Sequence, residues 1–265
     1  MVKTISSLQN PFIKQLIQLK EKSKLRKQTG LFIIEGKREV SLAIKGNYTL
    51  ETLYYYADLF SASEAAALEP YGIDVIEISK AVYEKVAHRE TTEGVIAVAK
   101  SKKLSLENLN LTSKNPLILV AESPEKPGNI GALLRTADAA NIDAVIIANP
   151  LTDLYNPNII RSSVGGVFTV PIATGTTSEV IAHLKRHNIA IYPAILQESV
   201  AYDTIDFKTP SALVIGTESS GLSEEWRKNS TAKIQIPMEG KLDSMNLSVA
   251  AGILIFEAKR QRKYL

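Results

Sequence analysis

Three separated segments of the sequence carry polar side chains that core packing does not explain. In ESPEKPGNIGALLRTADAANI, Asn129 lies near a predicted helix start and Arg135 lies within an otherwise small and apolar helix. VIGTESSGLS puts Glu218 in a glycine-flanked turn, and IPMEGKLDSMNLSVAAGILIFEA carries Ser244 and Asn246 before an apolar helix. Each segment lies at or just beyond the carboxyl end of a predicted strand, where open α/β sheets bind ligands.

Each segment taken alone also has an ordinary interpretation. Asn129 and Ser244 are residue types that cap helices, and Glu218 is a common turn residue. Arg135 alone is equally consistent with a surface salt bridge. Only the combination of the three segments in this order is informative.

Two phosphate-binding signatures fail on inspection. Gly216 and Gly221 have the spacing of the two glycines of a P-loop, but Leu222 stands where the lysine is required. GNIGALLR at residues 128–135 lacks the three-glycine pattern that brings backbone close to a pyrophosphate. The sequence therefore argues against a P-loop NTPase and against a nicotinamide-binding Rossmann domain.

The three histidines supply neither a metal site nor a catalytic triad. His183 and His187 have the spacing to face one metal ion, but no third ligand is evident and the flanking LKR predicts a solvated helix. His88 is the only other histidine, so the sequence also offers few candidates for the base of a Ser-His-Asp triad. We expect no metal.

Composition places the chain among globular proteins. Its 265 residues are 45% hydrophobic and 22% charged, and they include no cysteine, which excludes disulfides, cysteine zinc sites and thiol nucleophiles. The N-terminus has no apolar stretch of signal-peptide type, and no run of about 18 apolar residues is long enough to cross a bilayer. We expect a cytoplasmic protein with no membrane association.

Basic residues gather at the two ends of the chain. Residues 1–46 hold ten Lys and Arg against three Asp and Glu, and the last seven residues add four basic groups. The stretch between them is acidic, so the net charge of only +3 conceals two cationic ends. This distribution suits a phosphate backbone, although the basic residues alone are equally consistent with a solvated helix face. The residues that we predict to contact such a nucleic-acid backbone are Lys14, Lys22, Lys24, Arg26, Lys27 and Arg38.

The first hundred residues predict a small α/β domain. Asn10 and Pro11 are suited to open a helix that ends before Gly30, with Phe12, Leu16 and Leu19 on one face. Apolar runs predict strands at 31–34, 53–56, 75–78 and 95–99, and helical patterns separate them at 37–45, 61–69 and 80–87.

A second α/β domain follows a polar linker. KSKKLSLENLNLTSKN ends at Pro116, so we predict domains over 1–100 and 116–265 joined by a linker over 101–115. Predicted strands at 117–121, 144–148, 189–192, 213–215 and 234–236 alternate with helices, and the last helix spans about 248–263. Continuous β-branched runs predict a mostly parallel sheet covered on both faces.

In this order, the three polar segments resemble the motifs of the SpoU, or TrmH-type, RNA 2′-O-ribose methyltransferases. The resemblance covers the whole second domain, including NPNIIRSSVGGVFTVPI. SLQNPFIKQL, LFIIEGKREV and TTEGVIAVAK resemble the ribosomal-protein-L30e-like substrate-binding module that often precedes this domain. The resemblance implies an α/β domain with a deep C-terminal trefoil knot, S-adenosylmethionine bound inside the knot, and a homodimer.

The resemblance also implies a role for each motif residue. Arg135, Asn129 and Glu218, with Ser244 and Asn246, match the catalytic positions. The cofactor pocket is assigned to Gly216, Ile236, Met238, Met245 and Leu247. Met245 departs from the usual leucine, and its similar volume predicts that the change is tolerated. Gly166 stands where alanine is common.

Methyl transfer to a ribose oxygen is an in-line displacement that requires no metal. Positioning of the two reacting atoms can supply roughly 7 to 11 kcal/mol of the acceleration. A guanidinium, with a pKa above about 12, is a poor base, so we assign Arg135 to anchor a phosphate and activate the hydroxyl. Proton abstraction by Arg135 is the minority alternative. In either role, Asn129 and Glu218 would orient the Arg135 side chain.

Ribosomal RNA is the favoured substrate and tRNA the less favoured one, because the first module resembles a ribosomal RNA-binding protein. A noncatalytic RNA- or ribosome-binding relative is the alternative, and it would not need to retain Arg135. A nucleotide-dependent oxidoreductase comes third because its fingerprint is absent.

Overall fold

The computed structural model describes residues 3–68, 71–88, 93–217, 221–241 and 244–264. Contacts between Cα atoms divide the chain into two compact units, which we describe separately. The N-terminal unit comprises Met1–Lys102 and Asp153–Thr169, and the C-terminal unit comprises Lys103–Thr152 and Val170–Leu265. Within the described residues, no helix is long and apolar enough to cross a membrane.

A mixed five-stranded sheet forms the centre of the N-terminal unit. The strands lie in the order β1-β4-β3-β5-β2, in which β1, β4 and β3 are parallel and β5 runs antiparallel to both β3 and β2. The elements are β1 (Lys3–Ile5), α1 (Pro11–Glu21), α2 (Ser23–Thr29), β2 (Leu31–Glu35), α3 (Lys37–Lys45), β3 (Leu50–Tyr55), α4 (Ala62–Ala66), β4 (Asp74–Ile78), α5 (Lys80–Val86), β5 (Val95–Lys100), α7 (Pro157–Ser162) and α8 (Gly166–Thr169).

Helix α1 begins as the sequence predicts. The Asn10 side chain accepts a hydrogen bond from the Phe12 N–H, 2.9 Å away, and Pro11 occupies the first turn. The predicted buried face is wrong at one position, because Phe12 is 44% exposed and Ile13 is buried beside Leu16 and Leu19. The predicted single helix is also divided, since Lys22 has extended backbone between α1 and α2.

Residues 153–169 pack with the N-terminal unit through one ion pair and a group of aromatic rings. Arg26 donates to both carboxylate oxygens of Asp153, with a closest distance of 2.6 Å. The Phe32 and Tyr155 rings stack with centroids 4.4 Å apart, and the Phe32 and Phe168 rings stack with centroids 6.1 Å apart. These contacts explain why the segment belongs to this unit although the predicted boundaries assigned it to the second domain.

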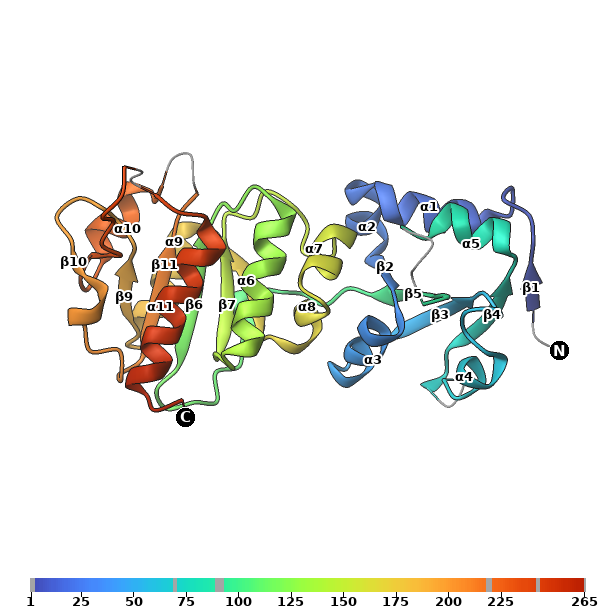
Figure 1. Cartoon of the computed structure of the whole chain (residues 1–265), viewed down its shortest axis with the longest axis horizontal. Helices are drawn as coiled ribbons and strands as arrows, with labels where there is room; N and C mark the ends of the chain where they lie inside the picture. The colour runs from blue at the N-terminus through green and yellow to red at the C-terminus, as the bar shows by residue number, and fades with distance from the viewer. Residues whose placement is uncertain (1–2, 69–70, 89–92, 218–220, 242–243, 265) are drawn as a thin grey trace. The chain divides into compact units, whose positions relative to one another are not determined.

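A five-stranded, fully parallel sheet forms the centre of the C-terminal unit (Figure 1). Its order is β8-β7-β6-β11-β9. The elements are η2 (Leu106–Asn108), β6 (Leu117–Glu122), α6 (Pro127–Ala139), β7 (Ala144–Ala148), β8 (Ile172–Gly175), α9 (Thr177–Arg186), β9 (Ala190–Pro193), β10 (Val200–Ala201), η3 (Tyr202–Thr204), β11 (Ser211–Ile215), α10 (Glu224–Asn229), β12 (Ile234–Gln235) and α11 (Leu247–Gln261).

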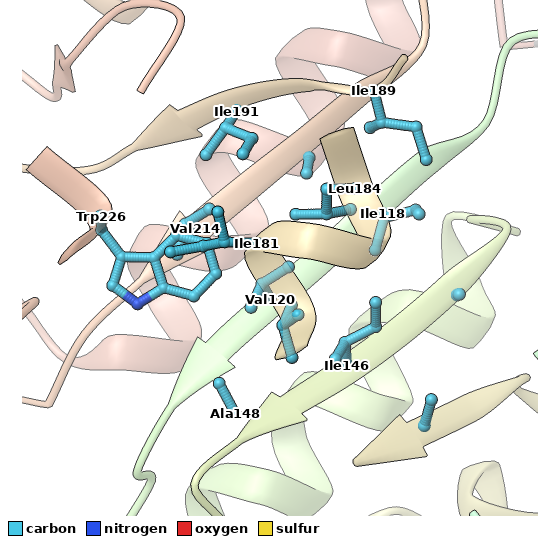
Figure 2. Close-up of a cluster of buried hydrophobic side chains, with 14 of the residues drawn as sticks. Ile118, Val120, Ile146, Ala148, Ile181, Leu184, Ile189, Ile191, Val214 and Trp226 are labelled. Atoms are coloured by element: carbon cyan, nitrogen blue, oxygen red, sulfur yellow. The ribbon is translucent and has the colours of Figure 1, made fainter. Parts of the chain in front are cut away.

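Helices cover both faces of this parallel sheet. In Figure 1, α6 and α11 lie side by side in front of the sheet and α9 lies behind it. Figure 2 shows the core on the α9 side, where Ile181 and Leu184 face Ile118, Val120 and Ile146. The three central strands, β7, β6 and β11, are buried along their whole length, as expected for a parallel sheet that is covered on both faces.

The structure of this unit differs from the sequence prediction in three places. The strand predicted at 234–236 is β12, which pairs with β10 in a separate two-stranded sheet and not with the main sheet. The main sheet instead includes β8, a four-residue edge strand after Pro171 that we did not predict. Part of the predicted linker is also packed, because Leu106 is buried in the core of the unit.

Candidate active site

A pocket of about 360 Å³ lies beyond the carboxyl ends of β9 and β11 and beside β12. Loops that follow strands form most of its wall, as in other open α/β sheets. The volume lies within the range of small-molecule sites. Its described lining residues are Ala194, Ile195, Leu196, Gln197, Ile215, Gly216, Thr217, Gly221, Leu222, Arg227, Gln235, Ile236, Met238, Ser244, Met245, Leu247 and Ala250.

All five positions predicted for the cofactor pocket line this one cavity. They are Gly216, Ile236, Met238, Met245 and Leu247, which come from the loop after β11, the loop after β12 and the start of α11. Ser244 lines the same cavity and is exposed. The residues are separated in sequence, so the pocket depends on two loops held side by side.

Gly216 is required by the backbone of its own loop. A Cβ atom there would overlap the carbonyl group of Gly221 and lie 2.6 Å from the Leu222 nitrogen. The Gly221 N–H donates to the Thr217 carbonyl, 3.0 Å away, and this bond holds Gly221 beside the end of β11. A side chain at position 216 would therefore displace the pocket wall itself.

One hydrogen bond joins the first polar segment to the third. Asn246 Nδ2 donates to Asn129 Oδ1 at 3.3 Å, while Asn246 Oδ1 caps α11 by accepting from the Ser248 N–H at 3.0 Å. Asn129 lies in the first turn of α6, and α6 packs against α11. The cap of α11 is therefore Asn246 and not Ser244, and Asn129 lies inside α6, whose N-cap residue is Lys126.

Arg135 lies farther along α6 and is exposed. Among the described residues, none forms an ion pair or hydrogen bond with its guanidinium, so the salt-bridge interpretation has no support there. Glu218, the remaining predicted catalytic residue, lies outside the described residues.

Sequence reasoning missed a buried carboxylate at the end of β6. Glu122 is 6% exposed and accepts hydrogen bonds from the Thr177 hydroxyl and from the Ser223 N–H and hydroxyl. Ser223 directly follows Leu222, which lines the pocket. Glu122 thus ties the central strand to the loop that forms one pocket wall. An acid at the first position of ESPEKPGN, directly after an apolar strand, was the available signal.

Two further parts of the pocket wall were also missed. Residues 194–197 follow the strand predicted at 189–192, so the strand-end rule that located the other loops would have included them. Arg227 comes from α10, and nothing local in EEWRKN indicates a pocket residue.

Of the six predicted RNA-binding residues, five are exposed: Lys14, Lys22, Lys24, Lys27 and Arg38. Arg26 is 5% exposed, paired with Asp153, and also donates to the Leu19 carbonyl at 2.6 Å. A guanidinium in that position has no access to a phosphate, which corrects the prediction for Arg26. Arg38 is exposed but pairs with Glu39 at 2.9 Å.

His183 and His187 lie side by side on α9, with ring centroids 4.4 Å apart. His187 Nδ1 lies 2.9 Å from the His183 carbonyl oxygen, and His183 is only 7% exposed. Burial lowers the pKa of His183, and the neighbouring His187 and Arg186 lower it further. In the part of the chain that the structure describes, no three His, Asp or Glu side chains are grouped to hold a metal.

Comparisons with known proteins identify both parts of the chain. The sequence model of the SpoU rRNA Methylase family matches residues 116–256, and that of the MRM3-like substrate binding domain matches residues 10–97. The 23S rRNA (guanosine(2553)-2′-O)-methyltransferase RlmP of Bacillus subtilis is 28% identical, over 97% of this chain and all of the relative.

Solved structures agree with these matches along the whole chain. The AdoMet-bound rRNA methyltransferase from Sinorhizobium meliloti is 31% identical, covers 98% of each chain and superposes with a TM-score of 0.88. A crystal structure of an RNA 2′-O ribose methyltransferase is 36% identical, covers 98% of this chain and 99% of that chain, and has a TM-score of 0.83. The predicted fold class, an α/β-knot domain preceded by a small α/β substrate-binding domain, is confirmed. The chain belongs to the SpoU rRNA methylase family.

Proposed function

We propose that the protein transfers a methyl group from S-adenosylmethionine to a ribose 2′-hydroxyl of 23S ribosomal RNA. Family membership makes it an RNA 2′-O-ribose methyltransferase, and the relative from Bacillus subtilis is named for this reaction on 23S rRNA. The observation that carries the site assignment is the single pocket lined by all five predicted cofactor positions. A noncatalytic relative would not need Arg135, so the intact motif favours the enzyme.

The residues of the pocket fit the proposed cofactor. S-adenosylmethionine, when bound, supplies an electrophilic methyl group on a sulfonium. The apolar side chains of Ile236, Met245 and Leu247 provide a wall for the adenosyl group, and the strand ends provide backbone groups for its polar edges. A largely apolar wall with a few polar groups is typical of small-molecule sites.

The residues that contact the methyl-accepting RNA are assigned to the exposed side chains of the same motifs. We assign Arg135 to hold an RNA phosphate and to stabilise the ribose oxygen as it loses its proton. A guanidinium keeps its proton at neutral pH, so its contribution is electrostatic. Asn246 and Asn129 form a pair that fixes α11 against α6. That pairing holds the first and third motifs in register with the pocket.

RNA affinity is assigned mainly to the N-terminal unit. Lys14, Lys22, Lys24 and Lys27 lie on α1 and α2, or between them, and all four side chains are exposed. Each phosphate neutralised contributes about −0.7 to −0.9 to the slope of log affinity against log salt. Titration of 23S rRNA fragments into wild type and a variant with all four lysines changed to glutamine should show a weaker affinity and a shallower slope. Equal slopes would contradict this assignment.

We also propose a homodimer formed through α6 and α11. Val249 and Phe256 of α11 are 54% and 43% exposed, and both are apolar. Gly128, Ala132 and Ala139 lie on one face of α6, and each is exposed or partly exposed. A row of small and apolar residues that is open to solvent is suited to association with a second copy. Sedimentation of wild type should give a dimer and that of Phe256→Lys a monomer, and a monomeric wild type would contradict the proposal.

A cytoplasmic location is part of the same proposal, because a 23S rRNA substrate is found there. Transfer of tritium from labelled S-adenosylmethionine to 23S rRNA by the purified protein tests the proposed function, with tRNA as the comparison substrate. Label in tRNA alone would shift the assignment to the less favoured substrate.

A further inference from the structure

A second hollow adjoins the proposed cofactor pocket. It is lined by charged side chains of both signs and shares Gln197 and Arg227 with the pocket. Its other lining residues are Glu198, Glu224, Lys228 and Lys233. Arg227 therefore lies where a largely apolar pocket opens into a charged hollow.

Arg227 is the only charged side chain among the described residues that line the pocket. Its side chain is 28% exposed. It forms a loose ion pair with the exposed Glu224, whose Oε2 lies 3.7 Å from Arg227 Nε, beyond hydrogen-bond distance. No described residue supplies a hydrogen-bond acceptor to the guanidinium. The N–H donors of the Arg227 guanidinium are thus available to a ligand.

The neighbouring cation is engaged elsewhere. Lys233 Nζ lies 2.6 Å from Glu198 Oε2, and this contact lowers the pKa of Glu198, which keeps the carboxylate ionised. The ion pair satisfies both partners, whereas Arg227, at the mouth of the pocket, has only the 3.7 Å contact with the exposed Glu224 among the described residues.

We propose that Arg227 binds the carboxylate of the methionine part of S-adenosylmethionine, an inference that rests on the proposed function. That carboxylate is the only anionic group of the cofactor. A guanidinium repels the sulfonium, so the amino-acid end is the part that fits beside it. The planar fork of arginine matches a carboxylate through two parallel hydrogen bonds. The adenosyl group then occupies the apolar part of the pocket, and the amino-acid end points toward the charged hollow.

Calorimetric titration with two ligands tests this inference without a turnover measurement. The ligands are S-adenosylmethionine and its decarboxylated form, which lacks only the carboxylate. Arg227→Ala should weaken binding of S-adenosylmethionine about tenfold, the low end for a charge-assisted bond, because the side chain is partly exposed. Binding of the decarboxylated form should be unchanged or tighter. Lys228→Ala is the matched control, since Lys228 lines only the charged hollow and carries the same charge.

Each outcome bears on a different claim. A wild type that binds neither ligand would overturn the proposed function and the inference together. A wild type that binds S-adenosylmethionine while Arg227→Ala weakens both ligands equally, or neither, would overturn the inference alone. Arg227→Lys, which keeps the charge and most of the side-chain volume, should retain an intermediate preference for the carboxylated ligand. Equal loss in Lys228→Ala would also overturn the inference, because it would show a general charge effect.

Discussion

Glu122→Ala should destabilise the C-terminal unit and loosen the cofactor pocket together. The Glu122 carboxylate is the shared acceptor for the Thr177 hydroxyl and for two groups of Ser223, at 2.8 Å each for the latter pair. Hydrogen bonds to a charged group contribute about 1.5 to 3 kcal/mol each when buried. Thr177 is buried, whereas Ser223 is exposed and regains water, so each bond to Ser223 contributes less to stability than the bond to Thr177.

The expected loss in the free energy of unfolding is about 3 kcal/mol for Glu122→Ala and about half of that for Glu122→Gln, which keeps one acceptor oxygen. Urea unfolding followed by fluorescence measures it, because the single tryptophan, Trp226, is fully buried in this unit and lies three residues after Ser223. S-adenosylmethionine affinity should fall in parallel, since Leu222 and Ser223 are adjacent.

Glu225→Ala is the matched control for this prediction. Glu225 accepts from the Ser178 hydroxyl at 2.9 Å, so it joins the same two helix starts from an exposed position. Glu225→Ala should lower the free energy of unfolding by less than about 0.5 kcal/mol. The reasoning would be refuted if Glu122→Ala left unfolding and cofactor affinity unchanged. Loss of methyl transfer with both quantities unchanged would instead make Glu122 a catalytic residue.

Four further outcomes follow from the structure. Arg26→Ala should lower the free energy of unfolding, measured by calorimetry, by about 3 to 5 kcal/mol, because it leaves the Asp153 carboxylate buried without its partner. Lys27→Ala, at an exposed position, should leave the stability unchanged. Arg135→Ala should abolish methyl transfer and leave S-adenosylmethionine affinity intact, and full activity would remove Arg135 from the mechanism. Gly216→Ala should reduce cofactor affinity and stability together, because the added Cβ overlaps the pocket loop, and unchanged binding would contradict this packing. His183 has a lowered pKa in the folded state, so the unfolded chain binds a proton there first and the stability falls as the pH drops below about 6.5. In urea unfolding at pH 5 and pH 7.5, His183→Leu should reduce this difference in stability. An unchanged pH dependence would exclude His183 as its source.

The sequence predicted elements best where one local pattern is sufficient. The apolar runs at 117–121 and 144–148 became β6 and β7, since a strand covered on both faces needs apolar side chains at every position. The strand β8 was missed because four residues after a proline give little periodicity to detect. The strand β12 was assigned to the main sheet because its apolar residues do not specify the strand with which it pairs.

The site followed the same division between local and long-range information. The motif order and the strand ends located the residues of two pocket loops, because those residues are close in sequence to the strands that position them. Burial of a charge was not predictable. Arg26 lies within a basic run, and its partner Asp153 is 127 residues away. Glu122 likewise has partners that no local pattern connects to it.

The central claim is methylation of a ribose oxygen, and the chemistry of RNA cleavage tests it most directly. Alkali cleaves RNA through the free 2′-hydroxyl, so a 2′-O-methylated ribose survives as a dinucleotide. The purified protein is incubated with 23S rRNA and S-adenosylmethionine labelled in its methyl group, and the RNA is then hydrolysed with alkali. We predict that the label is recovered in alkali-resistant dinucleotides and that Arg135→Ala gives none. Label in mononucleotides, which would indicate a methylated base, or no label in rRNA would contradict the account.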